Sequence, residues 1–254
     1  MKLLFHVTQH PGRRAEQQDR VLALSSGPVA LCLVADGVGG QRGGAFAAQA
    51  VADTARRLWE QATPAAADAG AFLQNLVAES HRAIREIGAE QGISPRSTMV
   101  AALLHGRRVS WASCGDSRLY HFQKRNLLWR SKDHTVVELL KDTGRIAEHE
   151  MGGHPDQGKL LQSLGDANAP EADFGEFTLG RAQWLLLCSD GFWEHLKQDE
   201  IASLHRLLDC SRARQERRLI RSILQRAGER CDNISLVVIM PSAPSLLLPG
   251  FLSR

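Results

Sequence analysis

The chain has 254 residues, of which 43% are hydrophobic and 23% charged, which suits one large domain or two small ones with a substantial core. Its net charge of +3 is too small to indicate nucleic-acid binding, and no apolar run approaches the ~20 residues that span a bilayer. The apolar stretch at residues 1–6 is too short for a secretory signal. We therefore expect a cytoplasmic protein that binds neither nucleic acid nor membrane.

The first third of the chain predicts three strands followed by two helices. Apolar residues dominate 3–8, 20–25 and 29–35, and the lengths of these runs are typical of strands. Apolar positions then recur at helical spacing over 43–59 and 71–88.

The rest of the chain predicts short strands in close succession, which favour antiparallel hairpins over parallel crossovers, and then a second pair of helices. The expected elements are strands 97–104, 108–115, 118–123 and 126–130, helix 136–142, an irregular segment 143–165, strands 173–179 and 183–188, helices 198–208 and 212–227, and strand 234–240. Strands followed by paired helices, twice over, predict an α+β protein with two sheets face to face and helices outside.

Five cysteines are present, and their pattern bears on the cellular compartment. The count is odd and no C-x-x-C pair occurs, so neither a disulfide framework nor a zinc site is expected. Free thiols, most of them buried in strands, fit a reducing cytoplasm. The residues are Cys32, Cys114, Cys188, Cys210 and Cys231.

Five aspartates lie close to the ends of the expected strands, far apart in the sequence. An apolar run that ends in Asp-Gly is typical of a buried strand that brings a carboxylate to one edge of a sheet. Crowded carboxylates repel one another unless a cation holds them, and oxygen-only ligands suit Mg²⁺ or Mn²⁺ rather than zinc. The aspartates are Asp19, Asp36, Asp116, Asp190 and Asp232.

An ordered set of short motifs links these aspartates to a known family. The set resembles the metal-dependent Ser/Thr protein phosphatases of the 2C (PPM) family, bacterial type, over nearly the whole chain. No single motif is specific, but their order is. The motifs are Arg14-x-x-x-x-Asp19, Asp36-Gly-Val-Gly-Gly40, Ser97-Thr98, Gly115-Asp-Ser-Arg118, Asp133-His134, Ser189-Asp-Gly191 and Asp232-Asn233.

The resemblance implies a fold and a domain organisation. The α+β pattern becomes a four-layer α-β-β-α sandwich of two antiparallel sheets flanked by helices. Residues 1–240 are expected to form a single phosphatase domain with a variable flap at about 143–165 beside the active site. The segment 241–254 lies outside the match and is expected to be a C-terminal tail.

The resemblance also implies the roles of the site residues. Asp36 would bridge two Mn²⁺ or Mg²⁺ ions, helped by the Gly37 carbonyl, with Asp190 and Asp232 as further ligands. Asp19 would lie near the ions, usually through water, and Asp116 would bind a possible third ion. Arg14 would bind the substrate phosphate, because a guanidinium can grip two phosphate oxygens at once.

The chain departs from the family pattern at two points. Gln17-Gln18 precedes Asp19 where the family usually has Asn-Glu, so one carboxylate is missing near the site. Val38 stands where some eukaryotic members have a histidine between the glycines, so that histidine acid is absent. Water on the metal ions is then the expected proton source, with His134 left as an alternative.

Three other patterns resemble known functional motifs, but each departs from its motif. Gly37-x-Gly39 lacks the third glycine of a dinucleotide-binding loop, because Arg42 occupies that place. His149 and His154 are spaced at i, i+5 with two glycines between, unlike a zinc-protease helix. Leu187 replaces the first glycine of a nucleophile elbow around Ser189, which disfavours a serine hydrolase.

The expected function is hydrolysis of phosphoserine and phosphothreonine on proteins by a water activated between two metal ions, without a phosphoenzyme. Implied partners are phosphorylated proteins and a bacterial Ser/Thr kinase. Residues 35–50 resemble members of the family that oppose a kinase controlling type VI secretion. We expect a monomer. We also expect the arginines of helix 212–227 to form a solvated face. The alternative is a catalytically silent member of the fold that binds phosphoproteins.

Overall fold

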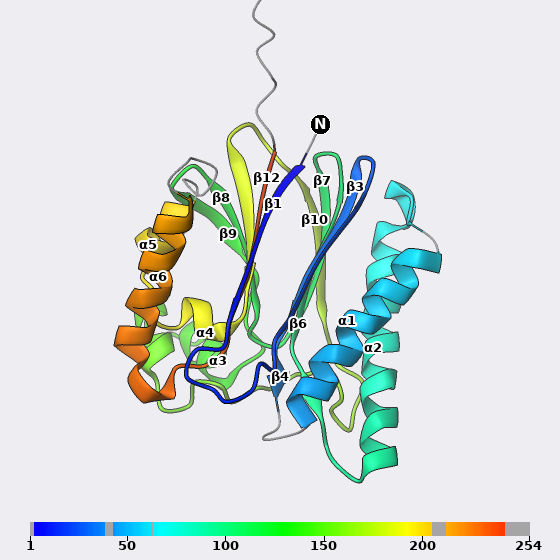
Figure 1. Ribbon diagram of the computed structural model, residues 1–254, viewed down its shortest axis with the longest axis horizontal. Helices are drawn as coiled ribbons and strands as arrows, with labels where there is room; N and C mark the ends of the chain where they lie inside the picture. The colour runs from blue at the N-terminus through cyan, green and yellow to red at the C-terminus, as the bar shows by residue number, and fades with distance from the viewer. Residues whose placement is uncertain (1–2, 39–42, 62, 205–211, 242–254) are drawn as a thin grey trace, which may run out of the picture.

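The computed structural model describes residues 3–38, 43–61, 63–204 and 212–241. Two five-stranded antiparallel sheets lie face to face, with α1 and α2 outside one sheet and α5 and α6 outside the other (Figure 1). This arrangement confirms the expected α+β sandwich. No helix in the described ranges is long and apolar enough to cross a membrane.

The first sheet has the order β10-β7-β6-β3-β2, and every adjacent pair is antiparallel. The inner strand β3 is almost entirely buried, because β6 and β2 pair with it on its two sides and both of its faces are covered. A strand covered on both faces has an unbroken apolar sequence rather than an alternating one. The strands are β2 (Arg20–Ser26), β3 (Val29–Ala35), β6 (Met99–His105), β7 (Arg108–Cys114) and β10 (Asp173–Thr178).

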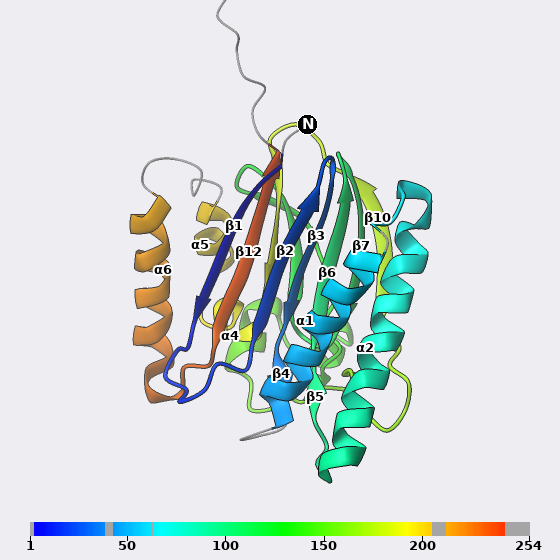
Figure 2. The same cartoon turned by 45° about the vertical axis from the view of Figure 1, so that its right-hand side comes forward.

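The second sheet has the order β1-β12-β11-β8-β9 and joins the two ends of the described chain. The first strand pairs along its whole length with the last, from Leu3 opposite Pro241 to His10 opposite Ile234 (Figure 2). The strands are β1 (Leu3–His10), β8 (Arg118–Gln123), β9 (Asn126–Arg130), β11 (Gln183–Cys188) and β12 (Ile234–Pro241).

Three layers of apolar side chains hold the sandwich together. Leu33 of β3 belongs to the layer under α1 (Gly43–Gln61) and α2 (Ala69–Gln91), while its neighbour Cys32 belongs to the layer between the sheets. Val238 of β12 belongs to the layer under α5 (Gln198–Ala202) and α6 (Arg212–Ala227). Because successive side chains of a strand point to opposite faces of the sheet, each strand contributes side chains to two layers.

Most expected elements are present, and the differences are local. The expected helix 198–208 ends early: α5 stops at Ala202, the Ser203 hydroxyl donates to the Glu200 carbonyl at 2.5 Å, and 205–208 lie outside the described residues. The expected tail 241–254 also lies outside them, apart from Pro241.

Several short elements were not expected, because two to six residues carry too little periodicity to be recognised. The strands β4 and β5 form a separate two-stranded ladder, and a 3-10 helix interrupts the segment 143–165, where an irregular backbone was expected. The short elements are β4 (Gly37–Val38), β5 (Arg96–Ser97), α4 (Asp190–Trp193), η1 (Ala66–Asp68), η2 (Glu148–Gly153) and η4 (Gly228–Arg230), while the expected helix α3 (Val136–Asp142) is present.

Candidate active site

The predicted site residues gather at the end of the sandwich where β4, α3 and α4 lie (Figure 1). A cavity of about 250 Å³ opens there. Its lining includes six of the seven residues expected from the sequence: Arg14, Asp36, Gly37, Asp116, Asp190 and Asp232. The seventh, Asp19, is buried and is not part of the lining.

The backbone of Asp36 is held in place by the Ser97-Thr98 pair. The Asp36 carbonyl accepts hydrogen bonds from the Thr98 amide at 2.8 Å and from the Ser97 hydroxyl at 3.0 Å. The Asp36 amide in turn donates to Thr98 Oγ1 at 3.1 Å. Sequence analysis singled out Ser97 and Thr98 as a motif but assigned them no role; the structure shows that they fix the backbone behind Asp36.

The glycines that follow Asp36 and Asp190 are needed because other backbone segments pass very close to them. A Cβ on Gly37 would lie 2.2 Å from the carbonyl oxygen of Gly44 in α1. A Cβ on Gly191 would lie 2.1 Å from the carbonyl oxygen of Asn233. Any side chain at either position would therefore force these segments apart. Close packing of the backbone around the cavity thus explains why a glycine follows both aspartates.

Behind the cavity, Asp19 is bound to the hydroxyl of Ser189. Ser189 Oγ donates to Asp19 Oδ2 at 2.9 Å and accepts a hydrogen bond from the Ser235 amide at 3.1 Å. Asp19 Oδ1 is buried and has no hydrogen-bond partner. Ser189 is fully buried, and its hydroxyl is used to position a carboxylate. This geometry gives no support to a serine-nucleophile mechanism.

Asp36, Asp190 and Asp19 have raised pKa values. Burial raises the pKa of Asp36 well above its ordinary value, and the charges of Asp19, Asp190, Asp116 and Asp232 raise it further. Burial, followed by the charge of Asp232, raises the pKa of Asp190 to about 7. Burial is also the main reason that the pKa of Asp19 rises to about 6. A cation among these groups would relieve both the burial cost and the repulsion.

Arg14 lies at the rim of the cavity and faces Asp232. Its Nη2 donates to Asp232 Oδ2 at 2.7 Å, and both side chains are partly exposed. The neighbouring Arg13 is not in the cavity lining; its backbone amide donates to the Cys231 carbonyl at 2.9 Å. Of the two adjacent arginines, Arg14 is therefore the one placed to meet a ligand.

Asn233 holds the loop that carries Arg14. Its Oδ1 accepts from the Gln18 amide at 2.7 Å, and its Nδ2 donates to the carbonyls of Pro11 and Glu16 at 3.0 and 3.1 Å. One side chain thus satisfies three backbone groups of a loop that is more than two hundred residues away in sequence. Sequence analysis named Asn233 without a role, and its position beside Asp232 was the only signal.

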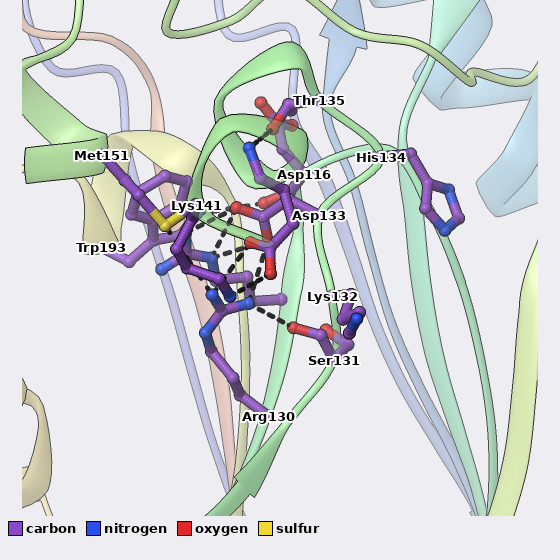
Figure 3. Close-up of polar contacts among 12 residues, drawn as sticks. Asp116, Arg130, Ser131, Lys132, Asp133, His134, Thr135, Lys141, Met151 and Trp193 are labelled. Carbon is purple, nitrogen blue, oxygen red and sulfur yellow. Dashed lines mark hydrogen bonds and ion pairs between the residues drawn. The ribbon is translucent and has the colours of Figure 1, made fainter. Parts of the chain in front are cut away.

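His134 lies apart from the reacting centre. Its Nδ1 accepts from the Gly115 amide at 3.3 Å, and its Nε2 is 3.3 Å from Asp173 Oδ2. It is not in the cavity lining, and Figure 3 shows it pointing away from Asp116 and Asp133. The geometry therefore does not favour His134 as the acid that protonates the leaving group.

Arg118, from the Gly115–Arg118 motif, supports Asp116 through a buried ion pair and an aromatic ring. Its guanidinium donates to both carboxylate oxygens of Asp133, at 2.8 Å from Nε and 2.5 Å from Nη2, and lies 3.2 Å from the centre of the Trp193 ring. Trp193 Nε1 then donates to the Asp116 carbonyl at 3.1 Å (Figure 3).

Arg130 ties the flap to the second sheet. Its side chain is 9% exposed and pairs with Glu138 of α3 at 2.9 Å and with both oxygens of Glu148 at 2.8 and 2.9 Å. Burial opposes ionisation of Glu148, but the hydrogen bonds and charge of Arg130 outweigh it and lower the pKa of Glu148 to about 2. Met151 of the flap is buried beside this group (Figure 3).

The later part of the flap reaches the cavity. Gly158 and Leu160 belong to the lining, and Leu160 forms an isolated bridge with Thr135. Leu164 forms a second bridge with Ser97, through hydrogen bonds of 3.0 and 2.9 Å. Because Ser97 also holds the Asp36 carbonyl, the flap is connected directly to the backbone of the site.

The donor chemistry of the cavity fits a hard divalent cation. The side-chain ligands expected from the sequence are all carboxylates. One of them, Asp19, has a buried oxygen without a hydrogen-bond partner. Across the described ranges, however, no three carboxylate, imidazole or thiolate groups already surround one point. Asp36, Asp116, Asp190 and Asp232 line one cavity instead, and their side chains would have to move to close around an ion.

Comparisons with known proteins identify the family. Residues 8–225 match the family model described as protein phosphatase 2C. The serine/threonine phosphatase stp of Listeria monocytogenes serotype 4b is 30% identical over 178 residues, which are 68% of this chain and 71% of that protein. The chain belongs to the protein phosphatase 2C family. This confirms the expected enzyme class, a protein-serine/threonine phosphatase.

Solved structures agree with this assignment. The catalytic domain of the serine/threonine protein phosphatase PstP in complex with two manganese ions is 29% identical, with a TM-score of 0.76, over 93% of this chain and 97% of that one. PppA, described as a key regulatory component of the type VI secretion system in Pseudomonas aeruginosa, is 26% identical, also with a TM-score of 0.76, over 94% and 97% of the two chains.

Proposed function

We propose that the chain hydrolyses phosphoserine and phosphothreonine on proteins with two Mn²⁺ or Mg²⁺ ions held by Asp36, the Gly37 carbonyl, Asp190 and Asp232. Asp116 would contribute to a third, weaker site, and Asp19 would support the ions from behind the cavity. The observation that carries this proposal is the crowding of five buried or partly buried carboxylates at one cavity, where burial and the neighbouring charges raise the pKa of Asp36 and Asp190. The two manganese ions in the PstP structure support it.

When bound, such a pair of ions lowers the pKa of a shared water toward neutrality and so supplies the nucleophile. The protein's own groups do the rest. Arg14 binds two oxygens of the phosphoryl group and orients it, because its planar guanidinium matches that spacing. The hydrogen bonds from Ser97 and Thr98 hold the Asp36 backbone, and Ser189 orients Asp19. A side-chain nucleophile is not needed, so no phosphoenzyme forms.

The test is hydrolysis of p-nitrophenyl phosphate and of a phosphothreonine peptide by the purified protein, with EDTA, Mg²⁺ and Mn²⁺ in parallel. We expect turnover of both substrates with metal and none in EDTA. A folded, metal-loaded protein that is inactive on both substrates would contradict the proposal and support the alternative, a silent member of the fold that binds phosphoproteins.

We further propose that the enzyme acts in the cytoplasm, as a monomer, against a bacterial Ser/Thr kinase. Four described cysteines are free and buried, which supports a reducing compartment. The similarity to PppA supports a kinase that controls type VI secretion. Incubation with the autophosphorylated kinase, followed by mass spectrometry of its phosphorylation sites, tests this; unchanged occupancy of every site would contradict it.

The proposed phosphatase domain covers residues 1–240, with the flap at about 143–165. Its support is the pairing of β1 with β12 along both ends of that range. A chain shortened to 1–241 should keep the full activity on p-nitrophenyl phosphate, and a large loss would show that the tail belongs to the domain.

A further inference from the structure

A second hollow lies on the other side of the β4–β5 ladder from the active-site cavity. It has a volume of about 720 Å³ and runs between the last turns of α2, the loop before β5 and the turn that ends the flap. We call it the α2 groove. The partly exposed Ile93 gives it an apolar floor, and its lining also includes Arg85, Arg96 and Asp166.

The charges of the α2 groove are not balanced. Arg96 Nη1 is 3.4 Å from Asp166 Oδ1, and Arg85 Nη1 is 3.5 Å from the Asp166 carbonyl, so both contacts are long. The other oxygen of Asp166 accepts from the amide and the hydroxyl of Ser163, at 2.9 and 2.6 Å. One guanidinium thus contacts the Asp166 carboxylate, which Ser163 already engages, while the other contacts only the Asp166 backbone carbonyl. An additional anion would be stabilised between them.

The α2 groove is close to the active site. Val38 and Gly37 line the active-site cavity, and they pair directly with Arg96 and Ser97 across the β4–β5 ladder (Figure 2). Paired strands lie ~4.8 Å apart, and an extended chain advances ~3.3 Å per residue. A peptide with its phosphorylated residue in the cavity would therefore reach the groove within a few residues.

We propose that the α2 groove binds an acidic segment of the phosphoprotein substrate, a few residues from the phosphorylated serine or threonine. This inference rests on the proposed function and adds a substrate preference to it. Aspartate, glutamate or a second phosphorylated residue would pair with Arg85 and Arg96, and an apolar side chain of the same segment would pack on Ile93. The apolar floor and the neighbouring acidic cavity favour a peptide over a nucleic acid, because a uniform polyanion would be repelled there.

The test compares two phosphothreonine peptides, one with glutamates at three to six residues from the phosphothreonine and one with glutamines. The variant is Arg85→Gln/Arg96→Gln, and the matched control is Arg82→Gln. Arg82 lies on the same helix, but its guanidinium pairs with Glu79 and Glu86, and it is not part of the groove.

For the wild-type protein we expect kcat/KM to be roughly tenfold higher with the acidic peptide, the size of one exposed charge-assisted contact. The preference should be lost in the double variant and kept in Arg82→Gln, with hydrolysis of p-nitrophenyl phosphate unchanged in both. Equal kcat/KM for the two peptides with wild-type protein would overturn the proposal, as would a preference that survives in the double variant.

Direct binding separates this proposal from the phosphatase activity. Fluorescence anisotropy of the labelled acidic peptide without phosphate requires no turnover. Binding that weakens about tenfold in the double variant supports the groove even if p-nitrophenyl phosphate is not hydrolysed. Hydrolysis by the wild-type protein, together with peptide binding that is equal in the double variant, would overturn the groove and leave the phosphatase proposal intact. The single variant Arg85→Gln, at an exposed position, repeats the measurement if the double variant is unstable.

Discussion

The guanidinium of Arg14 donates to the carboxylate of Asp232 at 2.7 Å, so a proposed phosphate-binding group is paired with a proposed metal ligand. The two residues come from opposite ends of the chain, and Asn233 holds the Arg14 loop against the segment that carries Asp232. An incoming phosphoryl group would compete with Asp232 for the guanidinium, while a cation would compete with Arg14 for the carboxylate. Metal and substrate binding should therefore favour one another.

Arg14→Ala should lower kcat/KM for a phosphothreonine peptide mainly through KM. The loss of a charge-assisted contact to phosphate is worth about 2–3 kcal/mol, which corresponds to roughly 30- to 150-fold. The melting temperature should change little, because exposed ion pairs contribute about 0–1 kcal/mol. Arg13→Ala is the control; a larger defect in that variant would show that the wrong arginine was assigned.

Asp36→Asn should abolish turnover even at saturating Mn²⁺, because Asp36 is one of the carboxylates proposed to hold the ions. The same variant should have a higher melting temperature than the wild type in EDTA, since one of the mutually repelling buried charges is removed. Steady-state assays and thermal unfolding check the two effects. Near-normal turnover would contradict the two-metal assignment, and a lower melting temperature in EDTA would contradict the electrostatic argument.

Ser189→Ala should retain most of the activity and lose stability. The substitution leaves the Ser235 amide and one oxygen of Asp19 without their partner, a cost of about 1–3 kcal/mol. Denaturant unfolding in EDTA measures the stability, and p-nitrophenyl phosphate hydrolysis at saturating Mn²⁺ measures the activity. Complete loss of turnover with unchanged metal affinity would contradict this prediction and support a mechanism in which Ser189 is the nucleophile.

Arg130→Met should destabilise the protein by roughly 3–5 kcal/mol, because it leaves Asp133 and Glu138 charged, buried and without one of their cations. It should also expose the flap to limited proteolysis, since Glu148 loses its two short contacts with Arg130 and keeps the longer ion pair with Lys141. Lys132→Gln, which removes only an exposed pair with Asp142, serves as the control and should change the stability by less than about 1 kcal/mol. Equal protease resistance in both variants would show that Arg130 does not hold the flap.

The metal-free protein should lose stability as the pH rises through the range in which Asp190 ionises. The pKa of Asp190 is raised from 3.8 to about 7 in the folded state, so the folded state binds this proton more tightly than the unfolded state does. Its contribution is then largest at low pH and is lost between about pH 4 and 7.

Thermal unfolding in EDTA at pH 5.5 and 7.5 measures this contribution, with Asp190→Asn as the reference. The difference in melting temperature, wild type minus variant, should fall as the pH rises. Mn²⁺ should stabilise the wild type more at pH 7.5 than at pH 5.5, because it binds the ionised form. A difference that is constant or rises with pH would contradict the prediction.

The long elements of the fold could be predicted from the sequence because burial leaves a clear pattern there. β3 is covered on both faces and is an unbroken apolar run, and α2 shows regular helical spacing. The β4–β5 ladder and α4 could not be predicted, since they are too short to have a period and form only where distant segments meet.

The chemistry of the site was predictable in kind but not in detail. The type and order of the motifs were enough to predict that Asp36, Asp190 and Asp232 lie at one site, and all three line the same cavity. The placement of Asp19 behind that cavity, and its hydrogen bond to Ser189, depend on how two strands from different sheets pack together. No local pattern encodes such a contact.

The pairing of β1 with β12 has a consequence for protein synthesis. The second sheet is complete only when the last strand lies beside the first, and the cavity needs Arg14 from one end of the chain and Asp232 from the other. A chain still emerging from the ribosome therefore lacks both a strand of its second sheet and part of its site until Asp232 and β12 have been made. The phosphatase domain therefore cannot act on neighbouring proteins before β12 has left the ribosome and paired with β1.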